Sequence, residues 1–268
     1  MEIDVPKFET CFFLDGGLEL HVPGGQGTPY VEQPAYRADH LKISNKHLSF
    51  LHDPRFLAAY RRGMQSGHHI LRPKGSDDDI HIEYRVYVCC WAAATAAKLP
   101  GDFVECGVNT GIYALAIYDY LSFESLGKRF FLFDTFCGPP AAQRLATESA
   151  ALFEHQSQFY SECYDIARRN FAPYPSATLV RGMVPDTLPS VDVEAVAYLS
   201  IDMNLTYPER EAIRYFWPKL VPGAVVLLDD YAWQGHDEQR KAHDEFAASV
   251  GHPILTLPTG QGLLIKGR

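Results

Sequence analysis

Short apolar runs alternate with longer mixed stretches from about residue 84 to the end of the chain. The apolar runs are rich in β-branched and aromatic residues, which suit strands buried on both faces of a sheet. Runs of this kind are DFVECGV (102–108), RFFLFD (129–134), ATLVRG (177–182), VAYLSID (196–202) and AVVLLDD (224–230). Between and beside them we expect helices over 84–99, 112–126 and 237–250, helical material across 141–171, and a helix in PEREAIRYFWPKL (208–220). This alternation predicts an α/β fold with a mostly parallel sheet and helices on both faces.

The two ends of the chain differ from this regular part. Near the C-terminus, PILTLP (253–258) and GLLIKG (262–267) are separated by three residues, Thr259 to Gln261, and predict a closing hairpin with an antiparallel strand. The sheet then has seven strands. Residues 1 to about 80 are turn-rich and predicted to be irregular. We therefore expect an extension over residues 1–83, as a lid, a substrate region or a dimer region, and a main domain over 84–268.

Composition narrows the classes of partner. The chain has 268 residues, 47% of them hydrophobic, and a net charge of −9. An acidic chain is a poor binder of nucleic acid, which needs a basic face. No apolar run approaches the roughly 18 residues of a membrane span, and the N-terminus does not resemble a signal peptide. We expect a cytoplasmic protein whose cysteines are reduced core residues rather than zinc ligands, namely Cys11, Cys89, Cys90, Cys106, Cys137 and Cys163.

Carboxylates lie at the ends of the predicted strands, and Asp229 and Asp230 directly follow the apolar run VVLL. If the strands take the usual order for such a sheet, Asp202 at the end of the preceding strand lies beside them. Three carboxylates at one edge repel one another unless a cation, hydrogen-bond donors or water compensates them. An all-oxygen cluster suits Mg2+ or another hard divalent cation. The alternative is that one Asp caps a helix while the others are solvated.

The segment VECGVNTGIYA contains an E-x-G-x-x-x-G pattern from Glu105 through Gly107 to Gly111. A glycine turn between a strand and a helix lets a ligand approach the backbone and free N–H groups. The dinucleotide fingerprint is absent, because Asn109 and Ile112 stand where it needs glycine. A nucleoside without a pyrophosphate, such as S-adenosylmethionine, fits better. The alternative is a pair of ordinary turn glycines.

Two further residues are candidates for the same site. Asp134 ends the strand RFFLFD and could accept hydrogen bonds from both ribose hydroxyls, or could instead cap the turn toward Gly138. His236 follows the acid pair at the start of a helix. It could serve as a base or contact the substrate, although a histidine in that place is more often a surface residue.

With these motifs in place, the chain resembles the macrocin (TylF/MycF-type) sugar O-methyltransferases, which depend on S-adenosylmethionine. The resemblance covers roughly residues 84–268 and rests on ExGxxxG, FDTF-x-G-P, RGMVPDTLP, the run from Ser200 to Leu220, VPGAVVLLDDY and GQGLLIK in this order. It implies a Rossmann-like methyltransferase fold, with Mg2+ on Asp202, Asp229 and Asp230. The positions that it indicates for the cofactor are Glu105, Cys106, Gly107, Gly111, Asp134, Thr135, Gly182 and Asp202. One departure concerns the acceptor side, because Asn204 stands where the family often has an acid.

The resulting prediction is transfer of a methyl group to a hydroxyl of a sugar, a glycosylated small molecule or a bacterial glycan. Asp202 or His236 would take the proton, since a sugar hydroxyl is too weak an acid to ionise unaided. The expected partner is a small molecule, and a homodimer is possible; neither nucleic acid nor membrane is expected. Two alternatives stay open: a metal-dependent hydrolase on the same sheet, and a non-catalytic interaction protein with a relict fold.

Overall fold

The computed structural model describes residues 34–70 and 78–267. The chain divides into two units, residues 1–48 and 49–268. In the described part of the first unit, β1 (Pro34–Ala38) and β2 (Leu41–Ser44) form an antiparallel hairpin. Asp39 and His40, at its turn, both have positive φ angles of 50° and 58°. A two-residue turn with this backbone matches the twist of the strands that it connects.

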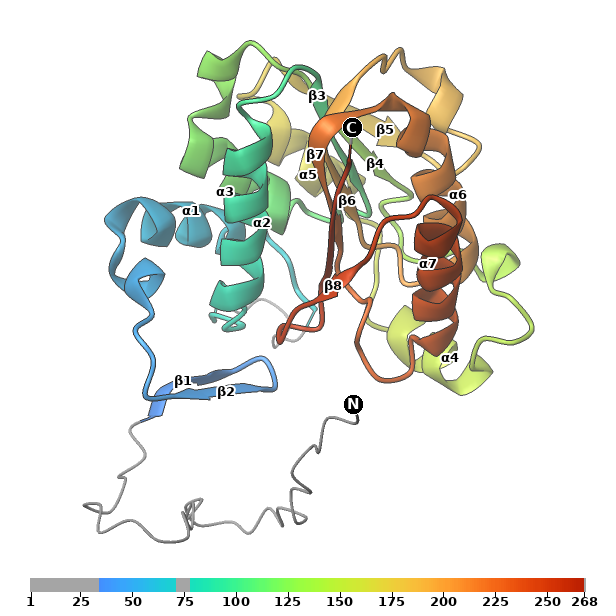
Figure 1. Ribbon diagram of the computed structural model, residues 1–268, viewed down its shortest axis with the longest axis horizontal. Helices are drawn as coiled ribbons and strands as arrows, with labels where there is room; N and C mark the ends of the chain where they lie inside the picture. Colours follow the sequence, from blue (N-terminus) through green and yellow to red (C-terminus); the bar gives the residue numbers. More distant parts are fainter. Residues whose placement is uncertain (1–33, 71–77, 268) are drawn as a thin grey trace, which may run out of the picture. The chain divides into compact units, whose positions relative to one another are not determined.

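The second unit contains a seven-stranded sheet with the order β5-β4-β3-β6-β7-β9-β8 (Figure 1). All pairs from β5 to β7 are parallel, whereas β9 is antiparallel to both β7 and β8. The predicted fold class, including the antiparallel C-terminal hairpin, is thereby confirmed. The strands are β3 (Asp102–Cys106), β4 (Phe130–Asp134), β5 (Ala177–Arg181), β6 (Val196–Ile201), β7 (Leu220–Leu228), β8 (Leu255–Thr256) and β9 (Gly262–Ile265).

Helices cover both faces of this sheet (Figure 1). In the view of Figure 1, α2 and α3 lie on one side of the strands, and α6 and α7 lie on the other. The helices are α1 (Pro54–Met64), α2 (Glu83–Ala96), α3 (Ile112–Leu121), α4 (Ala150–Ser157), α5 (Tyr164–Phe171), α6 (Thr206–Phe216) and α7 (Asp237–Ser249). The helix predicted to run to residue 126 is interrupted at Ser122, which has a φ angle of 49°, and continues as a 3-10 turn.

Helix α1 corrects the prediction that residues up to about 80 are irregular. Asp53 caps the helix by accepting a hydrogen bond from the backbone N–H of Arg55, and Pro54 occupies the first turn. The buried residues recur at helical spacing and pack on α3. At Gly63 a Cβ atom would lie only 2.6 Å from the carbonyl oxygen of Ile112, so glycine permits this close approach. The helix was not predicted because its buried positions lie within a turn-rich part of the sequence. These positions are Phe56, Ala59, Tyr60, Gly63 and Met64.

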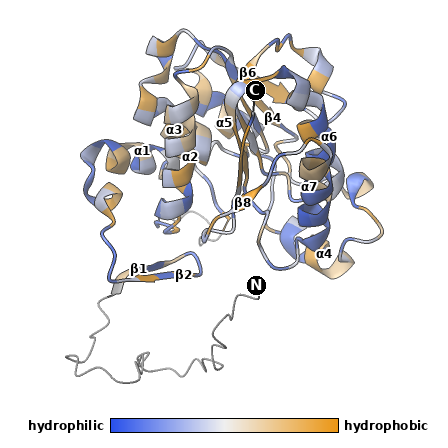
Figure 2. Cartoon of the chain, viewed as in Figure 1, coloured by the Kyte–Doolittle hydropathy of each residue, from blue (hydrophilic) through white to orange (hydrophobic). Residues whose placement is uncertain are grey.

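The apolar core lies on both faces of the sheet. Every residue of β6 is buried, and the strands of the sheet are largely apolar in Figure 2. Cys89, Cys90, Cys106 and Cys163 are buried free thiols, as expected, whereas Cys137 is exposed and Cys11 lies outside the described residues. The prediction of a core position is therefore wrong for Cys137, because this residue follows the strand in a turn at the sheet edge.

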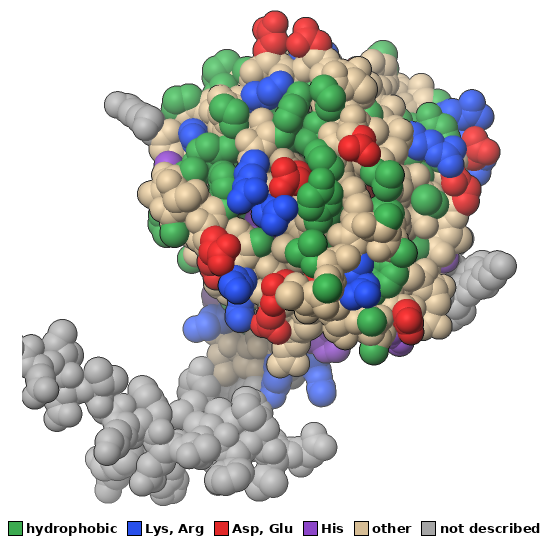
Figure 3. Space-filling view, turned by 90° about the vertical axis from the view of Figure 1, so that its right-hand side faces the viewer, with side chains coloured by type: hydrophobic (Ala, Val, Ile, Leu, Met, Phe, Trp, Pro, Cys, Tyr) green, Lys and Arg blue, Asp and Glu red, His purple; other side chains and the backbone are tan. Residues whose placement is uncertain are grey.

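The surface carries charges of both signs. On the face toward which α4, α6 and α7 lie, Figure 3 shows acidic and basic side chains interspersed with hydrophobic ones. Among the described residues, no helix is both long and apolar enough to cross a membrane.

Candidate active site at the carboxyl edge of the sheet

The register of three parallel strands brings the candidate residues together. Cys106 of β3 pairs with Ile201 of β6, which in turn pairs with Leu228 of β7. The next residues along the three strands are Gly107, Asp202 and Asp229. These residues therefore leave the sheet at the same level, at the edge where parallel α/β sheets bind their ligands.

Asp202, Asp229 and Asp230 form a cluster at this edge. One carboxylate oxygen from each lies within 4.8 Å of the other two. Burial, followed by repulsion from Asp229 and Asp230, raises the pKa of Asp202 well above its usual value. Burial also raises the pKa of Asp230 to about 6, against a lowering influence from His236. The acids thus retain a repulsion that a bound cation would relieve.

Asp229 differs from its two neighbours because protein donors surround it. Arg85 of α2 donates from Nη1 to Oδ2 at 2.8 Å, and Gln261 donates from Nε2 to Oδ1 at 2.9 Å. The hydroxyl of Tyr113 donates to both oxygens, at 3.1 and 3.2 Å. Burial raises the pKa of this phenol, so that it remains a donor. Arg85 also lies 5.4 Å from the centre of the Trp233 ring.

The carboxylate oxygens of Asp202 and Asp230 are suitable ligands for a hard divalent cation, and Asp229 completes the cluster. Among the described residues, the carboxylate of Asp202 accepts only a long contact, 3.4 Å, from Nδ2 of Asn204, and Asp230 lies 3.8 Å from Nδ1 of His236. Sequence reasoning missed the partners of Asp229. A lone arginine in the apolar helix EYRVYVCCW and a glutamine between two glycines were the available signals.

The glycine turn is built by the protein's own packing. Gly107 has a φ angle of 92°, and a Cβ atom there would lie 1.7 Å from the carbonyl oxygen of Asp202. Gly111 has a φ angle of 101°, and a Cβ atom there would lie 2.5 Å from the Phe171 ring. Only glycine tolerates this combination of backbone angle and contact. Beside the turn, Oε2 of Glu105 is buried without a hydrogen-bond partner in the described structure. Burial, followed by repulsion from Asp134 and Asp229, raises the pKa of Glu105 well above its usual value.

Asp134 holds this turn in place. It accepts hydrogen bonds from the backbone N–H groups of Val108 and Asn109, at 2.5 and 2.7 Å. It also accepts one from the N–H of Phe136, as expected for an Asp that caps its own turn. Asp134 therefore links the end of β4 to the start of the glycine turn at the end of β3. A role in binding ribose would add to this function rather than replace it.

The remaining candidates for cofactor contact lie around the same edge. The hydroxyl of Thr135 donates to the carbonyl of Gly138 at 2.7 Å. Gly182 has a φ angle of 142°, and its N–H donates to the carbonyl of Asp134 at 2.9 Å. The side chain of Cys106 is fully buried in the apolar core, so only its backbone lies at the edge. The prediction for Cys106 is thus restricted to its peptide groups.

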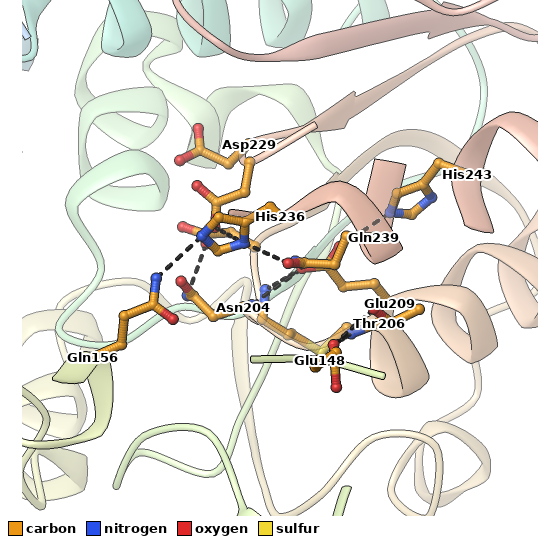
Figure 4. A network of polar contacts seen from close by, with 12 residues as sticks. Glu148, Gln156, Asn204, Thr206, Glu209, Asp229, His236, Gln239 and His243 are labelled. Atoms are coloured by element: carbon orange, nitrogen blue, oxygen red, sulfur yellow. Dashed lines mark hydrogen bonds and ion pairs between the residues drawn. The ribbon is translucent and has the colours of Figure 1, made fainter. Parts of the chain in front are cut away.

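His236 lies beside a cavity of about 310 Å3. Its lining comprises Thr147, Glu148, Ser149, Leu152, Phe153, Gln156, Asn204, Leu205 and residues 235–239. His236 is only 7% exposed and contacts Gln156 and Gln239, so it is not the surface residue of the alternative interpretation (Figure 4). Tyr231, which directly follows the acid pair, is buried and donates to Asp244 at 2.6 Å, which indicates a packing role.

Strand order, glycine turn and acid cluster together define a Rossmann-like methyltransferase fold. The chain belongs to the macrocin O-methyltransferase (TylF) family, whose sequence model matches residues 86–256. The solved structure of the O-methyltransferase NovP superimposes with a TM-score of 0.63 at 21% identity. This match covers 79% of the present chain and 88% of NovP, and it supports the fold.

Two curated relatives share part of the sequence. The 8-demethyl-8-(2,3-dimethoxy-alpha-L-rhamnosyl)-tetracenomycin-C 4'-O-methyltransferase of Streptomyces olivaceus is 28% identical over 151 residues, which are 53% of this chain and 58% of that protein. The mycinamicin III 3''-O-methyltransferase of Micromonospora griseorubida is 26% identical over 156 residues, which are 53% of this chain and 59% of that protein. The chain thus matches somewhat more than half the length of these relatives.

Proposed function

We propose that the protein is an S-adenosylmethionine-dependent, Mg2+-assisted O-methyltransferase that acts on a hydroxyl of a sugar or of a glycosylated small molecule. The observation that carries the proposal is the acid cluster lying one strand from the glycine turn in a member of this family. The relatives, whose names describe methylation of glycosylated natural products, support the sugar acceptor.

Each group of residues has a distinct task in this proposal. When bound, S-adenosylmethionine supplies an electrophilic methyl group, and Mg2+ on Asp202, Asp229 and Asp230 polarises the acceptor hydroxyl. The turn from Glu105 to Gly111, with Asp134, Thr135 and Gly182, would hold the cofactor. Methyl transfer to oxygen needs an in-line approach, so the main contribution of these residues is positioning.

The acceptor would enter the cavity beside His236. Polar side chains, such as those of Asn204 and Gln156, line this cavity together with the apolar side chains of Leu152 and Phe153. A sugar ring presents the same combination of hydroxyls and apolar C–H faces. The hydroxyl proton would pass to Asp202 or to Nε2 of His236. Residues 1–83 would contribute a cover for the acceptor or a dimer contact.

The proposal is tested by calorimetric titration of S-adenosylhomocysteine into the metal-free protein and into the protein with Mg2+. We expect micromolar binding of the nucleoside and a separate Mg2+ signal that is weakened at least about 10-fold in Asp230→Asn. Incubation with isotopically labelled S-adenosylmethionine and a panel of neutral glycosides then identifies the acceptor. Absence of nucleoside binding under both conditions would reject the methyltransferase proposal and favour an enzyme or an interaction protein that uses the acids without this cofactor.

A further inference from the structure

A chain of buried polar side chains runs from the inside of the molecule to His236 (Figure 4). His243 contacts Oε2 of Glu209 through Nε2 at 3.0 Å, and Gln239 donates from Nε2 to Oε1 of Glu209 at 2.9 Å. Oε1 of Gln239 in turn contacts Nδ1 of His236. All four residues, Glu209, His236, Gln239 and His243, are buried, with exposed fractions of 7% or less. Burial of so many polar groups requires that each hydrogen bond has a defined direction.

The direction of these bonds follows from Glu209. Its Oε1 already accepts hydrogen bonds from the backbone N–H groups of Met203 and Asn204, at 3.0 and 3.1 Å. Gln239 must therefore turn its NH2 group toward Glu209, because the reverse orientation would place two acceptor oxygens together. Its carbonyl oxygen then faces His236 and can only accept. Consequently Nδ1 of His236 carries the hydrogen, and Nε2 of the neutral ring carries the lone pair.

The lone pair on Nε2 faces the side of the ring where the cavity lies. Nε2 accepts a hydrogen bond from Nε2 of Gln156 in α4 at 3.1 Å, and both residues line the cavity. A hydroxyl group in the cavity could take the place of the Gln156 amide and donate to the same lone pair. The opposite tautomer would present an N–H group there and could not accept a proton.

We propose that Gln239 and Glu209 are positioning residues that hold His236 in the tautomer with Nε2 free to accept a proton from a hydroxylated ligand. This inference rests on the proposed function for the nature of that ligand. The same carboxylate of Glu209 also fixes the backbone directly after Asp202, where Asn204 has a φ angle of 58°. One buried side chain thus orients both the imidazole and the segment that follows the acid cluster.

A purely structural role must be distinguished, because Glu209 and His243 also join α6 to α7. The variant Gln239→Met removes the hydrogen-bond acceptor of Nδ1 while keeping a side chain of similar size. The other acceptor on this side of the ring, Oδ2 of Asp230, lies 3.8 Å from Nδ1, beyond hydrogen-bond distance. The matched control His243→Leu removes the far end of the chain, where Glu209 keeps its bonds to Gln239 and to the backbone. Both variants lose a buried hydrogen bond between helices, but only the first one changes the partner of His236.

The readout is 15N nuclear magnetic resonance of the histidine side chains at pH 8 in the full chain, with the His236 signals assigned by their loss in His236→Asn. We expect Nδ1–H in the wild type and in His243→Leu, and a change to predominantly Nε2–H in Gln239→Met. Detection of Nε2–H in the wild type, or of unchanged Nδ1–H in Gln239→Met, would overturn the proposal. Unfolding curves of both variants report any shared loss of stability.

Activity gives a second, separable result. With an identified acceptor, Gln239→Met is expected to lower kcat by about 100-fold, the usual contribution of a general base, without changing the KM for the methyl donor. If the tautomer changes as expected but no glycoside is methylated by the wild type, the positioning role stands and the proposed function fails. If kcat is unchanged although the tautomer switches, His236 takes no proton and the proposal fails.

Discussion

The two sides of the acid cluster are built in opposite ways. Asp229 is surrounded by Arg85, Tyr113 and Gln261, which fill both of its oxygens with donors. Within the described part of the chain, the carboxylates of Asp202 and Asp230 have only longer contacts, at 3.4 and 3.8 Å, and their pKa values are raised. One carboxylate is therefore compensated by the folded protein, while the other two remain poised for a ligand. Three acids with the same sequence signal thus have different energetic roles.

The strongest test of this comparison is Asp229→Asn. The substitution removes the carboxylate that lies 2.8 Å from the largely buried guanidinium of Arg85, and breaking such a buried ion pair costs about 3 kcal/mol of folding free energy. Urea unfolding of the metal-free variant measures this loss directly. A free energy of unfolding equal to that of the wild type would show that Asp229 is not the compensated member of the cluster.

Arg85→Met should give a smaller loss, about 2 kcal/mol, because Tyr113 and Gln261 still donate to Asp229. Mg2+ should reverse much of it, since a divalent cation can replace the missing positive charge, and binding to the native state raises stability. The measurement is the increase in Tm caused by Mg2+, which we expect to be larger in Arg85→Met than in the wild type. Arg129→Met, which removes a partly exposed ion pair with Asp102, serves as the control and should show the wild-type increase.

Asp230→Asn should behave in the opposite way to Asp229→Asn. Removing this charge relieves repulsion within the cluster, so the metal-free variant should be as stable as the wild type or more stable by about 1 kcal/mol. Its affinity for Mg2+ should fall at least about 10-fold, equivalent to ~1.4 kcal/mol. Calorimetric titration with MgCl2 checks the affinity. A variant that is destabilised by as much as Asp229→Asn would remove the distinction between the two acids.

The pH dependence gives the smallest expected effect, on the order of 1 kcal/mol after screening by nearby water. The folded-state pKa of Asp230 is raised from 3.8 to about 6. Its contribution to stability is therefore fully present below about pH 4 and is lost as the pH rises through about 6. Metal-free protein should lose stability between about pH 4 and 6 by this amount (~1 kcal/mol) relative to Asp230→Asn, and Mg2+ should remove this loss. Chemical unfolding at several pH values, with and without Mg2+, provides the measurement.

Much of the fold was accessible from the sequence because strand and helix signals were local. The apolar runs fixed β3, β4, β6 and β7, and the acids at their ends marked the correct edge. Helix α1 was missed since its apolar positions lie among turn residues. The partners of Asp229 could not be predicted, because Arg85, Tyr113 and Gln261 are 144, 116 and 32 residues away along the chain. Pairwise contacts of this kind arise only from the packed tertiary structure.

The network behind His236 was hidden for a similar reason. An acid in the first turn of a helix, such as Glu209, favours the positive helix end, and this role needs no partner. In the folded chain it is buried and accepts hydrogen bonds from Gln239 and from the backbone after Asp202. A helix-start acid and a buried acceptor look the same in a sequence. The distinction depends on whether another helix covers the position, here α7.

The close contact between Gly107 and the carbonyl of Asp202 gives the site a mechanical property. A single added methyl group at residue 107 would overlap an atom of the neighbouring strand end, at 1.7 Å. The glycine turn and Asp202, which we propose to hold the cofactor and the cation, therefore cannot move independently. A displacement of Gly107 would move Asp202 through this backbone contact, and the reverse also holds. The parts of the site proposed for the methyl donor and for the acceptor are therefore expected to move together.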